Sequence, residues 1–149
     1  MSRPGGAEPP RRGPTIRVYR DADFAAVEAI WNALFPASAH YHAPAWSIRS
    51  MVATAPDLFF VAELGGEVVG TVLAGWDGHR GWIYSLAVRP ELQRNGIGSA
   101  LLDHAIAALR ERGCPKVNLQ VRGGNRDVVA FYERHGWKVE DRLSMGITV

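Results

Sequence analysis

Residues 86–112 read LAVRPELQRNGIGSALLDHAIAALRER, and this stretch decides the fold because it joins a strand to a long helix through a turn with two glycines. On the strand side, residues 82–88 are dense in aromatic and apolar residues and stop before Pro90, which cannot donate a ladder hydrogen bond. On the helix side, apolar residues recur at 3.6-residue spacing until Gly113 and Pro115 end the pattern. The stretch therefore predicts a strand, a glycine turn and an amphipathic helix.

The turn at residues 93–98, QRNGIG, has the properties of an anion site. A helix start leaves its first backbone N–H groups without partners, and no Ser, Thr or Asp in this turn can cap them, which leaves Asn95 as the candidate cap. Gly96 and Gly98 allow positive φ and close approach of a ligand, while the helix dipole and Arg94 favour an anion. Spacing alone leaves two interpretations open, a phosphate cradle and a turn that needs glycine only for its geometry.

Two other nucleotide motifs do not fit these glycines. A P-loop requires Lys followed by Ser or Thr, and no Lys follows Gly98. A dinucleotide fingerprint requires a third glycine and an acidic residue on the next strand, where this chain has Leu101 and Gln120.

The pattern Q-R-x-G-x-G at residues 93–98, after an apolar strand, resembles the acetyl-CoA pyrophosphate motif of the GNAT superfamily of N-acetyltransferases. Downstream, Asn125 and residues 130–137, AFYERHGW, resemble the second motif of that family at the usual separation. The pair is more specific than either half. The resemblance covers about residues 15–149.

Within the superfamily, the sequence is most similar to small bacterial acetyltransferases of the RimI and YpeA type, through residues 75–81 and 112–116. This resemblance implies that backbone groups of Leu86, Ala87 and Val88 pair with the pantetheine arm of acetyl-CoA, and that Asn125 also binds the cofactor. It further implies that the pyrophosphate is held by backbone amides of Arg94, Asn95, Gly96, Ile97, Gly98 and Ser99. Gln93 also belongs to the expected cofactor site.

Acyl transfer to an amine requires a neutral nucleophile, a stabilised oxyanion and a proton for the departing thiolate. The resemblance puts Tyr132 beside the sulfur and makes it the candidate general acid, whereas the residues alone also allow a core tyrosine. RimI-type enzymes carry a glutamate base where this chain has Gln120, and an amide cannot accept that proton. Asp77 is the candidate substitute base, beside His79. Water, an acceptor that arrives neutral and the absence of catalysis are the alternatives.

The resemblance also places the acceptor amine near the irregular segment 37–45. No metal is expected, because the H-x-H pair at 40–42 without further ligands is weak support for a metal site. The expected acceptor contacts are Tyr41, His42, Trp46, His79 and Gln120.

The composition of the chain limits the classes of protein to which it can belong. A length of 149 residues, with 47% hydrophobic and 21% charged residues, predicts one soluble globular domain. The single Cys114 cannot form an internal disulfide, which favours a reducing cytoplasm, and no apolar stretch reaches the roughly 18 residues of a membrane span. The net charge of +2 lies in residues 1–14, so the neutral remainder gives little support for nucleic-acid binding.

Residues 1–14 are rich in Pro, Gly and Arg and are predicted to be a disordered tail, and residues 15–149 the acetyltransferase domain. The fold class is α/β (α+β in some schemes), with a mixed, mostly antiparallel sheet flanked by helices in the order β-α-α-βββ-α-β-α-ββ. Asp21 or Asp23 is expected to cap the first helix. The strands are expected at residues 15–20, 58–64, 67–75, 82–88 and 116–121, with a closing hairpin at 137–139 and 143–149.

We therefore expect an acetyl-CoA-dependent N-acetyltransferase that acetylates a primary amine by direct transfer within a ternary complex. The acceptor is left open among a protein N-terminus, a lysine, a polyamine and a small-molecule amine. The alternative from another class is a non-catalytic, acyl-CoA-binding regulatory module, which Gln120 suggests. The expected partners are acetyl-CoA and the acceptor, without nucleic acid or membrane, and a homodimer is allowed.

Overall fold

The computed structural model describes residues 12–35 and 42–149, and contacts divide the chain into two units, Met1–Asn118 and Leu119–Val149. The second unit contains one described helix, α4 (Arg126–Arg134). The first unit contains, in chain order, β1 (Thr15–Val18), η1 (Asp21–Asp23), α1 (Phe24–Leu34), α2 (Pro44–Thr54), η3 (Pro56–Leu58), β2 (Phe59–Leu64), β3 (Glu67–Trp76), β4 (Gly81–Val88), η4 (Pro90–Leu92), α3 (Ile97–Glu111) and β5 (Val117–Asn118), where η marks a 3-10 turn.

The sheet of the first unit has the strand order β1-β2-β3-β4-β5 and is antiparallel except for the parallel pair β4–β5. Gly65 and Gly66 join β2 to β3 with φ of 59° and 81°, the two positive values that a tight hairpin turn requires. This turn and the three antiparallel strands that lead into the glycine motif were predicted from the sequence. The mixed, mostly antiparallel sheet is confirmed.

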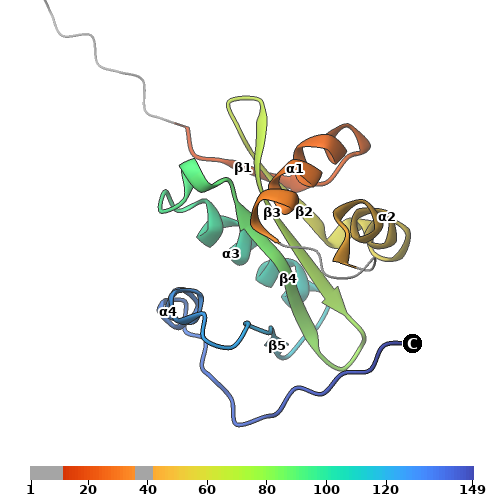
Figure 1. Cartoon of the computed structure of the whole chain (residues 1–149), viewed down its shortest axis with the longest axis vertical. Helices are drawn as coiled ribbons and strands as arrows, with labels where there is room; N and C mark the ends of the chain where they lie inside the picture. The colour runs from red at the N-terminus through yellow and green to blue at the C-terminus, as the bar shows by residue number, and fades with distance from the viewer. Residues whose placement is uncertain (1–11, 36–41) are drawn as a thin grey trace, which may run out of the picture. The chain divides into compact units, whose positions relative to one another are not determined.

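The two faces of the sheet carry different helices (Figure 1). Successive strand residues point to opposite faces, and in β2 the ring of Phe59 stacks on Trp31 of α1 while the neighbouring Phe60 meets His104 of α3 edge-on. The α1 and α2 face holds a core cluster with Val27 and Ile48 at 0% exposure. Of the predicted apolar stripe of α3, the opposite face buries Leu101, Leu102, Ala105 and Leu109, whereas Ile106 is half-buried. The same face also buries Ile97, which was not part of the prediction.

Helix α3 ends as its sequence predicts. Gly113 has a φ of 84°, and the backbone N–H of Cys114 donates to the carbonyl of Leu109 at 3.1 Å. This left-handed glycine closure satisfies a carbonyl that the helix would otherwise leave open.

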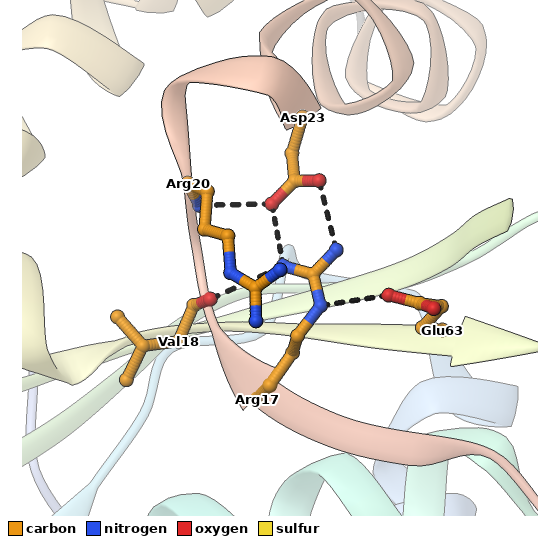
Figure 2. Close-up of polar contacts among 5 residues, drawn as sticks. All are labelled: Arg17, Val18, Arg20, Asp23 and Glu63. Atoms are coloured by element: carbon orange, nitrogen blue, oxygen red, sulfur yellow. Dashed lines mark hydrogen bonds and ion pairs between the residues drawn. The ribbon is translucent and has the colours of Figure 1, made fainter. Parts of the chain in front are cut away.

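A network of charged side chains connects β1 to η1 and to β2 (Figure 2). The guanidinium of Arg17 donates to both carboxylate oxygens of Asp23, at 2.7 and 2.9 Å, and to Glu63 of β2 at 2.8 Å. Asp23 also accepts the backbone N–H of Arg20 at 2.8 Å. The prediction that Asp21 or Asp23 caps α1 is wrong, since no side chain makes a cap bond to that helix and Asp23 faces Arg17 instead.

The predicted closing hairpin is absent. Residues 137–149 are described without any strand, and Leu143, Met145 and Ile147 are 95%, 94% and 89% exposed. Strand β5 is also shorter than predicted, with two residues in place of six. Alternating apolar residues favour an extended chain, but a strand also requires a neighbour for its N–H and C=O groups. The last residues of the second unit have no such neighbour within it.

No helix in the described part of the chain combines the length and the apolar character needed to cross a membrane.

Candidate active site

The turn between η4 and α3 is the candidate cofactor site. Gly96 immediately precedes the helix with a φ of 79°, and Arg94 has a φ of 65°. Left-handed backbone is uncommon for a residue with a Cβ and is found disproportionately at ligand sites. A Cβ built on Gly96 would meet nothing within 4 Å, so the space beside this residue is open.

The first amides of α3 are available to a ligand. No side chain caps the helix, and its first backbone bond runs from the N–H of Ala100 to the carbonyl of Gly96 at 3.0 Å. The N–H groups of Ile97 and Gly98 therefore precede the helical ladder. Asn95 does not cap them, because no side-chain oxygen accepts an N–H at the start of α3, and the Asn95 amide group donates to the carbonyls of Leu92 and Gln93 at 3.0 and 3.3 Å. The interpretation of Asn95 as the cap is thus wrong.

Gln93 joins this turn to strand β4. Its side-chain amide donates to the carbonyl of Val88 at 3.1 Å, which holds the end of the strand against the turn. On the other side, the N–H of Arg89 donates to Val69 of β3 at 2.9 Å. Since neighbouring strand residues direct their backbone groups to opposite edges, Val88 faces away from β3.

Beyond the first residues of β4, no strand of the first unit pairs with the edge of β4 that faces away from β3. The parallel pairing with β5 is confined to Gly81 with Val117 and Trp82 with Asn118. The edge at residues 86–88 is therefore a backbone surface that an extended ligand can pair with, and it leads directly into the start of α3. This unit thus brings the predicted residues Leu86 to Val88 next to the predicted turn, with Ser99 in the first turn of α3.

Asp77 and His79 lie in the turn between β3 and β4. A carboxylate oxygen of Asp77 accepts the backbone N–H groups of His79 and Arg80 at 2.7 and 2.8 Å. These bonds, the one from Arg80 foremost, lower the pKa of the Asp77 carboxyl. The turn adjoins Gly81, and Ala87 lies six residue-to-residue steps of about 3.3 Å each from Gly81 along the strand. Asp77 is therefore about 20 Å along the strand from the candidate cofactor edge.

The second unit contains three further candidates, Asn125, Gln120 and Tyr132. The side-chain oxygen of Asn125 accepts the N–H of Val128 at 3.3 Å and so caps α4, while its amide group has no acceptor among the described residues. The side-chain amide of Gln120 is exposed and donates to Ser144 at 2.5 Å. An Asn that caps a helix with its oxygen keeps two N–H donors, so capping and ligand binding are compatible.

Tyr132 packs between two aromatic residues of its own unit. Its ring meets Phe131 and Trp137 at centroid distances of 5.1 and 5.5 Å. Burial raises the pKa of the Tyr132 phenol to about 12. The hydroxyl therefore stays protonated, as a donor, throughout the physiological pH range.

Two of the candidate acceptor residues, His42 and Trp46, lie around the start of α2. His42 is exposed and Trp46 is 49% exposed, whereas Tyr41 lies outside the described residues. An open cleft of about 580 Å³ is lined by Trp46 and by Arg49, and Arg49 was not among the predicted site residues. Their spacing of three residues in a helix is the signal that could have identified Arg49. In the described ranges, no three His, Cys, Asp or Glu side chains form a group suited to a metal ion.

Comparisons with known proteins agree with this architecture. The model of the Acetyltransferase (GNAT) family matches residues 24–137. An acetyltransferase of Sodalis glossinidius (strain morsitans) is 42% identical over 131 residues, which are 86% of this chain and 89% of the relative. Ard1 from Thermoplasma volcanium has a TM-score of 0.77 and 27% identity, with 87% of this chain and 85% of that chain covered.

Another solved structure is the ribosomal-protein-S18-alanine N-acetyltransferase from Escherichia coli, with a TM-score of 0.66, 27% identity and coverage of 83% of this chain and 76% of that one. The family match spans most of the described chain, and the Sodalis relative is similar over nearly its whole length. The chain therefore belongs to the GNAT family, as an acetyltransferase whose co-substrate is acetyl-CoA.

Proposed function

We propose that this acetyltransferase is an N-acetyltransferase, which moves the acetyl group of acetyl-CoA directly to a primary amine within a ternary complex. The observation that carries the proposal is the uncapped start of α3, where Gly96 and Arg94 are both left-handed and the first amides precede the helical ladder. Free helix-start N–H groups and a guanidinium are the groups that bind a pyrophosphate. The single cysteine, Cys114, is consistent with action in a reducing cytoplasm.

The cofactor is proposed to extend from this turn along β4. Residues 94–99 hold the pyrophosphate, and the open edge of β4 pairs with the pantetheine arm through backbone groups of Leu86 and Val88. Support comes from the direction of the Val88 backbone groups away from β3 and from the short pairing of β4 with β5. Asn125 contributes the two amide donors that its capping oxygen leaves available.

In the proposed reaction, the neutral amine attacks the thioester carbon, the new C–N bond forms, and the tetrahedral intermediate collapses with cleavage of the C–S bond. The excess proton of the amine passes to water, the thiolate takes a proton from Tyr132, and the Tyr132 phenolate then regains a proton from water. Support for Tyr132 is its protonated phenol and the resemblance of its segment to the second family motif. This role remains the chemistry to be tested.

We propose that the acceptor amine binds beside the start of α2, where Trp46 and Arg49 line an open cleft. The similar enzyme from Escherichia coli acts, by its name, on the alanine N-terminus of a ribosomal protein. That similarity supports an α-amine over a lysine as the acceptor.

The proposal is tested by incubating the full-length protein with acetyl-CoA and a pooled library of peptides, polyamines and small amines. We expect free thiol to appear together with an equal amount of acetylated amine. Tight binding of acetyl-CoA, with thiol release no faster than in buffer for every acceptor, would instead favour the regulatory module that Gln120 suggests.

A further inference from the structure

Strand β4 contains a bulge immediately before the edge proposed to bind acetyl-CoA. Thr71 and Leu73 of β3 are two residues apart, whereas their partners Ala87 and Tyr84 are three residues apart. The extra residue lies at Ser85 or Leu86, and Ser85 has a φ of 49°. A residue with a Cβ seldom adopts this conformation, so its surroundings must hold it there.

The contact that holds it is a hydroxyl buried beneath α1. Thr71 is fully buried, and its hydroxyl donates to the carbonyl of Ser85 at 2.9 Å. The same oxygen lies 2.8 Å from the indole nitrogen of Trp31. An indole N–H can only donate, so the hydroxyl oxygen accepts from Trp31 and its single proton points to Ser85. The direction of both hydrogen bonds is thereby fixed.

This arrangement also sets the orientation of the next amide. The carbonyl of Ser85 and the N–H of Leu86 belong to one peptide unit, which is trans, so the two groups point in opposite directions. Because the carbonyl is held toward Thr71, the N–H of Leu86 points away from β3 and toward the open edge.

Trp31 is itself held firmly. It is 2% exposed and stacks on Phe59 at a centroid distance of 5.8 Å, and its carbonyl accepts the N–H of Phe35 at the end of α1. The position of its indole N–H is therefore fixed by these contacts.

We propose that Trp31 and Thr71 are positioning residues for the acetyl-transfer reaction, which hold the Ser85–Leu86 peptide so that the N–H of Leu86 faces the acyl-pantetheine arm of acetyl-CoA. This inference rests on the proposed binding of the cofactor along β4. It assigns a role in that site to two buried residues that touch neither substrate.

The test compares acetyl-CoA binding to Thr71→Val, Thr71→Ser and the wild type by calorimetry. Thr71→Val keeps the shape but removes the proton that holds Ser85, and we expect the affinity to fall about five-fold, the equivalent of one net hydrogen bond. Thr71→Ser restores the hydroxyl and should bind within about two-fold of the wild type. In labelled wild-type protein, the Leu86 amide resonance, assigned with Leu86→Ile, should shift on addition of acetyl-CoA.

Val72→Ala is the matched control, because Val72 is also fully buried in β3 but, as the neighbour of Thr71 in the strand, points to the opposite face of the sheet. It should lower the melting temperature and leave the affinity unchanged. Wild-type affinity in folded Thr71→Val overturns the inference, as does a Leu86 resonance that does not move. If Thr71→Val does not fold, Trp31→Phe decides in its place, with a loss of affinity of at least about two-fold expected and no loss contradicting the inference. A wild type that does not bind acetyl-CoA would instead refute the proposed function.

Discussion

Gly70 of β3 lies so close to Leu101 of α3 that a Cβ built on the glycine would be 2.9 Å from the leucine Cδ1 and 2.9 Å from the carbonyl oxygen of Ala87. Gly70 is also the partner of Val88 in the sheet. The absence of a side chain therefore allows the first turns of α3 to rest directly on the strands that lead into the cofactor turn.

We predict that Gly70→Ala destabilises the fold by about 1–3 kcal/mol, since the backbone carbonyl cannot move away as a side chain could. Gly75→Ala is the control in the same strand, because its added Cβ would meet only ordinary contacts of 3.6 Å and more. Chemical denaturation should show a loss for the first variant and little change for the second. Equal stabilities would contradict the close packing.

The network of Arg17 leads to a prediction about acid stability. The hydrogen bond from Arg17 is the main cause that lowers the pKa of Asp23 below its ordinary value of 3.8. A carboxyl whose pKa is lower in the folded state than in the unfolded state stabilises the protein at pH values above its unfolded-state pKa. This contribution disappears as the pH falls through the folded-state pKa. Asp23→Asn should therefore cost about 2 kcal/mol at pH 7 and progressively less below about pH 4.

The measurement is the free energy of unfolding of both proteins between pH 7 and pH 2.5. Asp103→Asn, on the exposed face of α3, controls for the general loss of a carboxylate. A difference between wild type and Asp23→Asn that stays constant over this range would show that Asp23 is not the group that titrates.

The local features of this fold could be predicted because single residues specify them. Gly65 and Gly66 supply the positive φ of a tight turn, and Gly113 supplies the left-handed end of α3. The apolar stripe of α3 predicted which face is buried. For the cofactor turn, the pattern of residues 93–98 identified the segment, although the pairing of Gln93 with Val88 could not be read from it.

Contacts between residues far apart in the chain were not predictable in this way. Trp31 and Thr71 are 40 positions apart, and nothing in either local sequence indicates the other. The alternation of apolar residues at 143–149 predicted a strand, because a pattern of side chains does not reveal whether a pairing partner exists. Gln120 was identified through the family resemblance, and the chemistry of an amide sufficed to cast doubt on it as a base.

The cofactor turn is tested by Gly96→Asp, which places a Cβ and a negative charge in the open space before α3. We expect acetyl-CoA binding to weaken by at least about ten-fold, because the added carboxylate repels the pyrophosphate and competes for the helix-start amides. Gly113→Asp is the control at the other end of the same helix, with a similar φ of 84° and equally open surroundings. Calorimetry that finds both variants binding as the wild type would place the pyrophosphate elsewhere.

Tyr132→Phe keeps the aromatic packing but removes the proposed proton donor. Proton transfer from a phenol of pKa about 12 to the thiolate of a thiol with a pKa near 8.5 is uphill by about 5 kcal/mol. The rate gain from this donor is therefore modest, and its removal should lower kcat by about 10²-fold. The high pKa also predicts no loss of kcat from Tyr132 ionisation between pH 8 and pH 10.5. Tyr19→Phe, another half-buried tyrosine, should leave turnover unchanged. Wild-type turnover in Tyr132→Phe, with chemistry rate-limiting, would exclude the role.

The last prediction concerns the base. A lysine with a pKa near 10.4 is only about 0.04% neutral at pH 7, a deficit of about 4.6 kcal/mol, whereas an α-amine near 7.8 is about 14% neutral, a deficit of about 1 kcal/mol. Gln120 cannot accept a proton, and the lowered pKa of Asp77 makes its carboxylate a weak base. For the α-amine, the free-energy cost of deprotonation is small enough that water alone can accept the proton. The preferred acceptor should therefore be an amine of depressed pKa.

We accordingly expect kcat/KM to rise with pH through the pKa of the acceptor itself. Asp77→Asn should leave this profile unchanged, because an Asn oxygen can still accept the N–H groups that form the turn. Gln120→Glu supplies a carboxylate at the position where the family resemblance predicts a base, so it should raise the rate on a lysine acceptor more than on an α-amine. The profiles are measured for the three proteins on an α-amine and a lysine peptide of otherwise equal sequence. A rising limb near pH 6 on the lysine peptide, lost in Asp77→Asn, would show that Asp77 is a dedicated base and that acceptor pKa does not decide the preference.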